Sequence, residues 1–265
     1  MPSTKHVVKH PCNKLPPLSS VIMRWLSELD ERTIHEFIGA TGDAAPRVTL
    51  VAISSIDGRG AVAGKSGGLG NEADLRLLKT LRDTADVVLA GSATVQTEGY
   101  CGVGRDRATR RFGSAGDRPI PPIAVLTRRF ELDPESRFFT DVATPPIVIG
   151  PAAAAATGSA LVEAGSEIMA LPDTDAASVV AALSNRGFAR IVIEGGPSVY
   201  REFLAAGVVD EIFLTVAPTW LGSGPLTLGP ANDPAAPPAM LDFTLEAVAH
   251  SDSHVFLRYS RGRAG

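Results

Sequence analysis

From residue 47 onward, the chain alternates short apolar segments with longer segments whose apolar residues recur at helical spacing. Apolar segments of about four to eight residues bounded by turn residues are typical of buried strands. The predicted strands cover 47–54, 86–91, 123–127, 146–150, 167–171, 190–195 and 210–218. Strands that alternate with helices form parallel sheets, because a parallel connection needs a crossover. The sequence therefore predicts an α/β fold with a mostly parallel, twisted sheet and helices on both faces.

The segments between these strands carry helix signals. One helix is predicted over 71–83, because Asn71 is a preferred N-cap residue and Leu75, Leu78 and Leu81 should lie on one face. Further helices are predicted over 152–164, 175–187 and 197–206. The last apolar segments, "FTLEAVAHSD" and "HVFLRYS", have no helix between them. We therefore expect antiparallel strands at the C-terminal end of the sheet.

The residues before 46 precede this alternation. Their apolar residues recur at helical spacing over 18–38, with Ser19 or Ser20 as the cap, and "ATGDAAP" ends the pattern. We therefore divide the chain into an N-terminal extension with one helix, 1–45, and one larger domain, 46–265.

Charge and cysteine content argue against several classes of function. The net charge of −4 gives no reason to expect nucleic acid or an acidic membrane as a partner. Cys12 and Cys101 are too few for a disulfide framework, and no Cys/His spacing resembles a zinc site. No apolar segment approaches the length of about 18 residues that a membrane span needs. We expect a soluble, cytoplasmic protein that binds a small molecule and no metal.

Polar and glycine residues follow four of the predicted strands, at the edge of the sheet where ligands bind in α/β folds. After the first strand, "ISSIDGRG" places Asp57 either toward a ligand or in a tight turn that it stabilises itself. After the second strand, Gly91 is followed by Ser92 and Thr94. The free N–H groups of such a helix start suit a phosphate, although an ordinary hydroxyl cap fits the same residues.

The third strand end is "LTRRF", where Thr127, Arg128 and Arg129 follow apolar residues. Arginine can bind a phosphate through two parallel hydrogen bonds. The pair is therefore placed to bind the 2′-phosphate that separates NADPH from NADH. A solvated basic turn is the alternative interpretation.

The fourth strand end is "IVIEGGPSVY", in which Glu194 closes an apolar strand and Gly195, Gly196 and Pro197 follow. Glycines let a pyrophosphate approach the backbone closely, and Pro197 suits the first turn of a helix. Glu194 is then placed either to accept hydrogen bonds from a ligand or to cap that helix.

All four segments lie at the same kind of strand end, as one shared cleft requires. Such a cleft combines phosphate-binding loops with a carboxylate for a polar heterocycle, and the sequence offers it no nucleophile–base pair or metal cluster. That combination suits hydride transfer, in which a cofactor supplies the chemistry and the protein supplies position and electrostatics.

Four segments resemble the pyrimidine reductase family of riboflavin biosynthesis: "SSIDG", "VVLAGSATV", "IVIEGGPSVY" and "VDEIFLTVAPTWLGSG". This family belongs to the dihydrofolate-reductase-like superfamily and also forms the reductase half of bifunctional deaminase–reductases. The resemblance covers about residues 47–260, and no zinc-deaminase signature precedes it. It implies a homodimer that uses NADPH to reduce the ribosyl carbon of a 5-amino-6-(5-phosphoribosylamino)uracil to the ribityl form.

The resemblance also implies roles for individual residues. Substrate contacts are implied for Ser66, Arg82, Arg105 and Glu194, with Arg105 on the ribose phosphate. Cofactor contacts are implied for Ile53, Gly68, Thr94, Arg128, Gly195, Gly196, Pro197 and Ser198. The strand-end residues complete the predicted cofactor site: Asp57, Gly91, Ser92 and Thr127. Glu98 matches the family's acid after the Thr-Val pair, so we place it at the cofactor and assign catalytic roles to Glu98 and Glu194.

The chain departs from the family pattern at three places. Val51 stands where many members have a lysine thought to help the proton step, and Gly68 replaces a tryptophan. The family's Asp-Asp/Asn-Pro stretch reads "TEGY", with Glu98 and Tyr100. Two alternatives stay open: a reductase of another pterin or pyrimidine, dihydrofolate included, or a nucleotide-binding homologue without catalysis.

Overall fold

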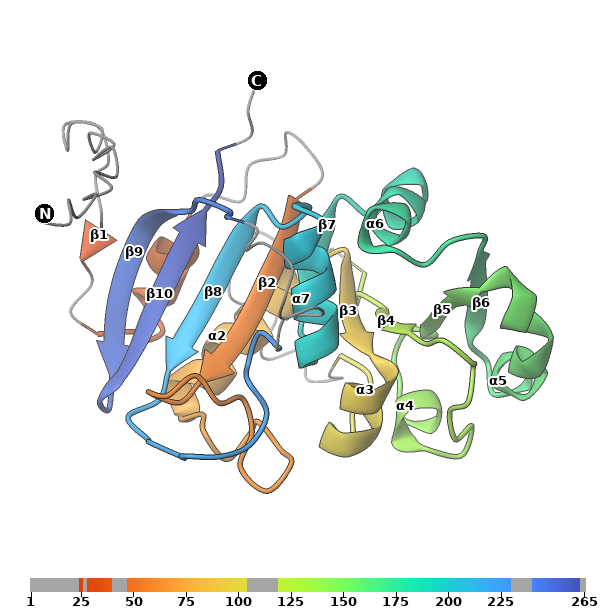
Figure 1. Ribbon diagram of the computed structural model, residues 1–265, viewed down its shortest axis with the longest axis horizontal. Coiled ribbons are helices and arrows are strands. Elements are labelled where there is room, and N and C mark those ends of the chain that lie inside the picture. Colours follow the sequence, from red (N-terminus) through yellow and green to blue (C-terminus); the bar gives the residue numbers. More distant parts are fainter. Residues whose placement is uncertain (1–23, 26–27, 40–46, 104–118, 230–239, 263–265) are drawn as a thin grey trace, which may run out of the picture.

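The structure, a computed structural model, describes residues 24–25, 28–39, 47–103, 119–229 and 240–262. Within these residues, ten strands form one sheet at the centre of the molecule (Figure 1). In chain order they are β1 (Arg24–Trp25), β2 (Arg47–Ser54), β3 (Val87–Gly91), β4 (Ile123–Leu126), β5 (Ile147–Pro151), β6 (Glu167–Leu171), β7 (Arg190–Ile193), β8 (Glu211–Val216), β9 (Thr244–Ser251) and β10 (His254–Ser260). Across the sheet they lie in the order β1-β9-β10-β8-β2-β7-β3-β4-β5-β6.

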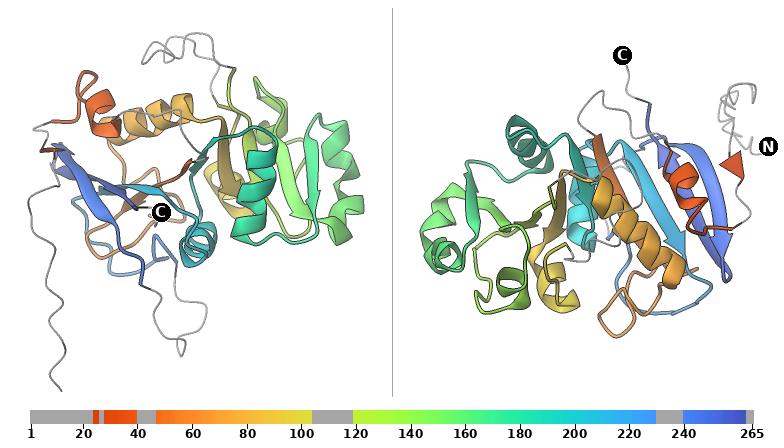
Figure 2. Two further views of the ribbon diagram at one scale, coloured as in Figure 1. Left: turned by 90° about the horizontal axis from the view of Figure 1, so that it is seen from above. Right: turned by 180° about the vertical axis from the view of Figure 1, so that it is seen from behind.

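The described helices cover both faces of this sheet. They are α1 (Ile34–Ile38), α2 (Glu72–Thr84), α3 (Ser92–Glu98), α4 (Arg137–Thr140), the 3₁₀ helix η2 (Ala152–Gly158), α5 (Ser159–Glu163), α6 (Ala176–Asn185) and α7 (Pro197–Ala205). Figure 2 shows α1 and α2 on one face and α7 on the opposite face. The segment predicted as one helix over 152–164 consists of η2 followed by α5. No helix in the described ranges is long and apolar enough to cross a membrane.

The predicted sheet architecture is confirmed. The strands from β8 through β2 and β7 to β6 pair in parallel. β10 pairs antiparallel with both β8 and β9. The two-residue turn between β9 and β10 consists of Asp252 and Ser253, both with positive φ. Such a turn reverses the chain directly, which is why the C-terminal strands are antiparallel.

The single helix predicted over 18–38 is wrong. Residues 24–25 form β1, which pairs with β9, and the helix α1 begins only at Ile34. Asp30 explains the late start, because its Oδ1 accepts hydrogen bonds from the N–H groups of Arg32 and Thr33 and so forms a turn before the helix. The predicted caps Ser19 and Ser20 lie outside the described residues.

The described part of the N-terminal extension packs into the core of the larger domain. Phe37 is completely buried, and its ring packs edge-on against Phe213 of β8 and Phe256 of β10, with centroids 5.8 and 6.5 Å apart. Leu29 and Ile34 join the same cluster. These contacts tie the extension to the antiparallel half of the sheet, while the boundary at 45/46 stays a prediction.

Helix α2 begins as predicted, and the leucines on its predicted face are buried to different degrees. The side chain of its N-cap, Asn71, accepts a hydrogen bond from the Asp74 N–H at 2.9 Å. Leu77 and Leu81 pack against the sheet, whereas Leu75 is 49% exposed. The helix lies at the border of a cavity, so its apolar surface is shared between the core and that cavity.

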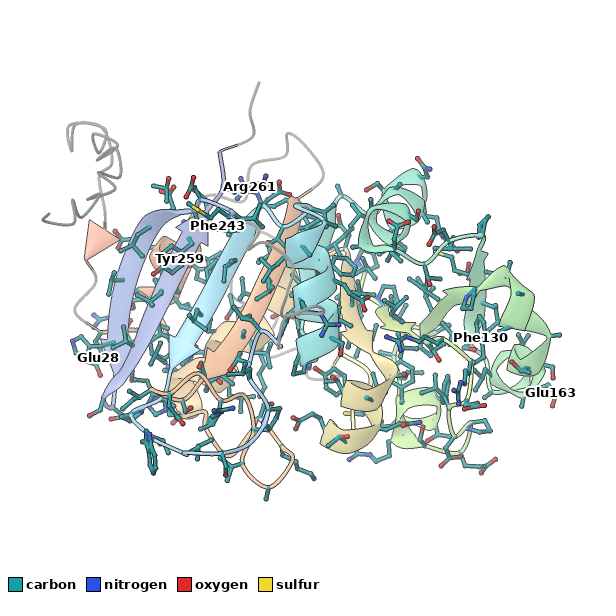
Figure 3. The ribbon with its side chains drawn as sticks, viewed as in Figure 1. Glu28, Phe130, Glu163, Phe243, Tyr259 and Arg261 are labelled. Atoms are coloured by element: carbon teal, nitrogen blue, oxygen red, sulfur yellow. The ribbon has the colours of Figure 1, made fainter. Side chains whose placement is uncertain are left out.

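Side chains fill the space on both sides of the sheet (Figure 3). One large cluster lies under α6 and α7, and a second lies under α3, α4 and α5. Phe130, labelled in Figure 3, belongs to the second cluster. Its ring packs so closely on β5 that a Cβ on Gly150 would lie 2.6 Å from it. This packing fixes the chain just after the end of β4.

Candidate active site

A cavity of about 750 Å³ opens at the carboxyl ends of β2 and β7, between α2, α3 and α7. The arrowheads of β2 and β3 mark this edge of the sheet at the bottom of Figure 1. Predicted site residues that line the cavity are Ile53, Ser66, Thr94, Glu98, Glu194, Gly196 and Pro197. Seven of the predicted site residues therefore share one cavity, and the role of each residue stays a prediction.

Glu194 lies at the base of the cavity in a cluster of hydrogen bonds. Arg82 of α2 donates from Nε to Oε1 and from Nη2 to Oε2, both at 2.6 Å. The Tyr100 hydroxyl donates to Oε2 at 2.7 Å, and the Arg82 guanidinium lies 5.3 Å from the Tyr100 ring centroid. The Glu194 side chain is only 3% exposed. A carboxylate offers about four acceptor positions, so one remains for a ligand N–H.

The cluster keeps Arg82 charged and Tyr100 neutral. Burial opposes the charge on Arg82, but the adjacent Glu194 carboxylate raises the pKa of Arg82 above its ordinary value. Burial and the same carboxylate raise the pKa of Tyr100 well above its ordinary value. A buried carboxylate is stable only when it is paired and hydrogen-bonded, and Arg82 and Tyr100 provide both for Glu194.

The two glycines after Glu194 are required by close packing. Gly195 has φ +95°, and a Cβ there would lie 2.7 Å from the Tyr200 ring. A Cβ on Gly196 would lie 2.5 Å from Oγ1 of Thr94. The Gly91 N–H donates to the Gly195 carbonyl at 2.6 Å, which ties this turn to the end of β3.

The turn leads directly into α7, whose first residue is Pro197. Its N-cap, Gly196, has no side chain, and the helix start therefore receives no side-chain cap. The first N–H groups of a helix have no partners within the helix and favour an anion. The end of α7 that borders the cavity thus suits a phosphate group.

Glu98 and Ser66 connect two loops of the cavity wall. The Ser66 N–H donates to Oε1 of Glu98 at 2.7 Å. This contact ties the loop between β2 and α2 to the end of α3. On the opposite wall, the buried Tyr200 hydroxyl donates to the Val51 carbonyl and holds α7 against β2.

The arginines after β4 lie outside the cavity and are open to solvent. The side chains of Arg128 and Arg129 are 85% and 77% exposed, and their nearest carboxylates are 3.8 and 3.7 Å away. Thr127 is buried and caps this turn, because its Oγ1 accepts hydrogen bonds from the N–H groups of Arg129 and Phe130. Both guanidinium groups are therefore available to an anion at this strand end.

Asp57 holds a loop instead of lining the cavity. Its carboxylate accepts hydrogen bonds from the N–H groups of Leu221 and Gly222 and from the Ser55 hydroxyl, at 2.7 to 3.0 Å. The Leu221 N–H and the Ser55 hydroxyl hold the pKa of Asp57 at about 2. Asp57 thus holds two segments together, namely the turn at the end of its own strand and the loop after β8.

The remaining predicted residues lie beside the cavity or beyond the described ranges. Gly67, and not Gly68, belongs to the cavity wall. Arg82 reaches the site through Glu194. Other residues that do not line the cavity are Gly91, Ser92, Gly195 and Ser198. Arg105 lies outside the described residues.

Sequence reasoning missed several residues of the cavity wall. Asp74, Leu75 and Leu78 lie on α2, Tyr200 on α7, and Thr227 in the loop after β8. One signal was available for Asp74, since an acidic residue three positions after a capping asparagine lies in the first turn and near the strand ends. The helical spacing of Leu75, Leu78 and Leu81 already accounted for this segment, so Asp74 was not singled out.

Comparisons with known proteins agree with this geometry. The family model described as the RibD C-terminal domain matches residues 46–257. The riboflavin biosynthesis protein RibD of Mycobacterium tuberculosis is 30% identical over 73% of this chain and 48% of its own length. The chain thus spans about half the length of that relative. The 2,5-diamino-6-ribosylamino-4(3H)-pyrimidinone 5′-phosphate reductase of Methanothermobacter thermautotrophicus is 27% identical over 67% of this chain and 80% of its own length.

A solved structure shares the fold. It is a pyrimidine reductase-like protein from Corynebacterium diphtheriae with a TM-score of 0.73 and 26% identity. The similarity covers 87% of this chain and 99% of that protein. With the match over residues 46–257, it shows that this chain belongs to the RibD C-terminal domain family.

Proposed function

We propose that the protein is an NADPH-dependent reductase of a 5-amino-6-(5-phosphoribosylamino)uracil-type substrate in riboflavin biosynthesis. The observation that carries the proposal is the Arg82–Glu194–Tyr100 cluster at the base of a cavity bordered by the Gly195–Gly196 turn. A buried carboxylate with one acceptor position left suits an N–H of a pyrimidine. The name of the Mycobacterium tuberculosis relative supports a role in riboflavin biosynthesis, and that of the Methanothermobacter relative supports the reduction of a ribosylaminopyrimidine phosphate.

The residues at the cavity edge fit a dinucleotide. The pyrophosphate would lie at the start of α7, where Gly196 leaves room beside Thr94. Because β7, β3 and β4 are neighbours in the sheet, a dinucleotide that extends from this turn past Gly91 reaches Arg128 and Arg129. These exposed arginines would bind the 2′-phosphate of NADPH. When bound, the reduced nicotinamide supplies the hydride.

The substrate would occupy the cavity with its pyrimidine on Glu194. Ser66 and Glu98 form the wall that faces this position from the loop before α2 and from α3. Arg105 is the residue proposed for the ribose phosphate. A homodimer and a cytoplasmic location remain part of the proposal, supported by the family resemblance.

The first test follows the oxidation of NADPH by its absorbance, with the deaminated ribosylaminouracil phosphate as acceptor. Saturable turnover is expected, and Glu194→Gln should raise the KM for the acceptor much more than the Kd for NADPH. A matched control is Arg186→Gln, which removes an exposed surface ion pair with Glu167. If Glu194→Gln weakened the binding of the acceptor and of NADPH equally, the proposed role of Glu194 would be contradicted.

Cofactor choice is tested separately. Replacing Arg128 and Arg129 together by alanine should weaken NADPH and leave the binding of NADH nearly unchanged, because only NADPH carries the 2′-phosphate. Turnover with dihydrofolate and not with the uracil derivative would favour the pterin alternative. NADPH binding without turnover of either acceptor would favour the non-catalytic homologue.

A further inference from the structure

Asp74 is an acid in the cavity that none of the predicted roles uses. It lies in the first turn of α2, lines the cavity and is partly buried. A Cβ on Gly70 would lie 2.6 Å from Oδ2 of Asp74, so a larger residue at position 70 would displace the carboxyl. Thr215 of β8, which pairs with Ile53 of β2, hydrogen-bonds to the carboxyl through its buried hydroxyl. Asp74 is therefore held on the sheet beside the predicted cofactor-side residue Ile53.

The surroundings of Asp74 favour its neutral form. Burial raises its pKa above the ordinary value, although the Thr215 hydroxyl and the nearby His254 act in the opposite direction. The His254 ring does not pair with the acid, because Nε2 and Nδ1 lie 2.9 and 3.2 Å from the carbonyl oxygens of Leu69 and Asp252. Tyr200, on α7, is a further titratable group near the acid, and burial, together with Glu194 and Asp74, raises the pKa of Tyr200 and keeps it neutral.

The other acids of the cavity wall already serve as acceptors. Glu72 accepts a hydrogen bond from Arg76 on the surface of α2. Glu194 accepts three hydrogen bonds from Arg82 and Tyr100. Glu98 accepts one from the Ser66 N–H. Val51, which lines the same cavity, has no titratable group. Within the described cavity wall, Asp74 is thus the carboxyl whose pKa is raised by burial.

We propose that Asp74 is the general acid of the reduction, an inference that rests on the proposed function. When bound, NADPH would supply the hydride that forms a new C–H bond at the ribosyl carbon, and the cofactor would be left oxidised as NADP⁺. The bond between that carbon and the ring oxygen breaks, and the oxygen takes the proton of the Asp74 carboxyl and becomes a hydroxyl. Asp74 is left as a carboxylate and regains a proton from solvent, so charge and atoms balance.

The kinetic test compares the wild type with Asp74→Asn across the pH range. The asparagine amide keeps the shape of the aspartate carboxyl and an oxygen that can accept the hydrogen bond from Thr215, but it has no acidic proton. In the wild type, kcat should fall as pH rises through the raised pKa of Asp74, because only the protonated acid can donate. Asp74→Asn should lower kcat by about 10²- to 10⁴-fold and lose this pH dependence, with NADPH affinity unchanged.

A matched control is Glu163→Gln, at the last residue of α5. The Glu163 side chain is exposed and does not line the cavity. The substitution makes the same change from a carboxyl to an amide, away from the site. It should leave kcat and its pH dependence unchanged.

A second measurement tests the protonation of Asp74 without any substrate. Carboxyl ¹³C NMR on the intact protein, assigned with Asp74→Asn, should show Asp74 titrating above the ordinary aspartate pKa of 3.8. A folded-state pKa above the unfolded value means that the native state binds more protons in this window. The wild type should therefore lose stability relative to Asp74→Asn as pH rises through it, visible as a shift in the difference between their Tm values.

The outcomes separate this proposal from the proposed function. An Asp74→Asn variant that keeps wild-type kcat and pH profile overturns the role of Asp74 while the reductase stands. If the wild type itself does not turn over the uracil derivative, the proposed function fails, and the NMR titration decides whether Asp74 holds an acidic proton. An ordinary aspartate titration overturns the proposal in either case.

Discussion

At the scale of single residues, the candidate site depends on one buried ion pair. Glu194 is almost fully buried, and Arg82 supplies both of its charged hydrogen bonds. Removing one partner of a buried pair leaves an uncompensated charge, whereas removing both does not. The pair should therefore show strong coupling between its two members.

We predict that Arg82→Met lowers the free energy of unfolding by about 3–5 kcal/mol, since it leaves the Glu194 carboxylate without a cation. The double variant Arg82→Met/Glu194→Gln should lose clearly less free energy of unfolding than the two single variants lose together. Urea denaturation of the wild type, the two single variants and the double variant measures this coupling. Additive losses would mean that the two side chains contribute independently and that the cluster is not a unit.

The residues of the site differ in how far the sequence revealed them. Glu194 could be placed because it closes an apolar strand before two glycines, and Arg82 because of the family resemblance. The contact between them could not be predicted, since 112 positions separate them in the chain. Tyr100 attracted notice only as a departure from the family pattern, and Asp74 did not stand out, because a first-turn aspartate also suits a helix dipole.

At the scale of elements, α2 links the core to the cavity. Strands of a parallel sheet are buried on both faces, so their apolar segments identified them directly. The leucines of α2 face two different environments, and helical spacing alone cannot divide them. The segment before α1 was misread for a related reason, since its pairing with β9 depends on residues more than 200 positions away.

A matched pair of leucines tests this division of α2. Leu77→Ala should lower the free energy of unfolding by about 2–5 kcal/mol, because Leu77 is 2% exposed and its loss leaves a cavity. Leu75→Ala should change it by no more than about 0.5 kcal/mol, because Leu75 is half exposed. Leu75 lines the active-site cavity, so its replacement should instead raise the KM for the acceptor. Similar losses of stability from both substitutions would contradict this orientation of the helix.

At the scale of the whole molecule, the N-terminal segment completes the antiparallel half of the sheet. The residues around α1 cover the face of β8, β9 and β10 that α2 leaves open (Figure 2). Without them, Phe213 and Phe256 would lose the ring of Phe37. The extension therefore acts as part of the folding unit and not as an appendage.

We predict that Phe37→Ala lowers the free energy of unfolding by about 3–5 kcal/mol, as expected for a fully buried aromatic side chain. Trp220→Ala is the control of similar size, because Trp220 is 72% exposed and its removal should cost little. Both variants should bind NADPH with wild-type affinity at low temperature, since Phe37 and Trp220 lie outside the cavity wall. The discriminating measurement is urea denaturation followed by far-UV circular dichroism. If Phe37→Ala is as stable as the control, residues 46–265 form a core that does not need the extension, and the division of the chain at 45/46 describes two separate units.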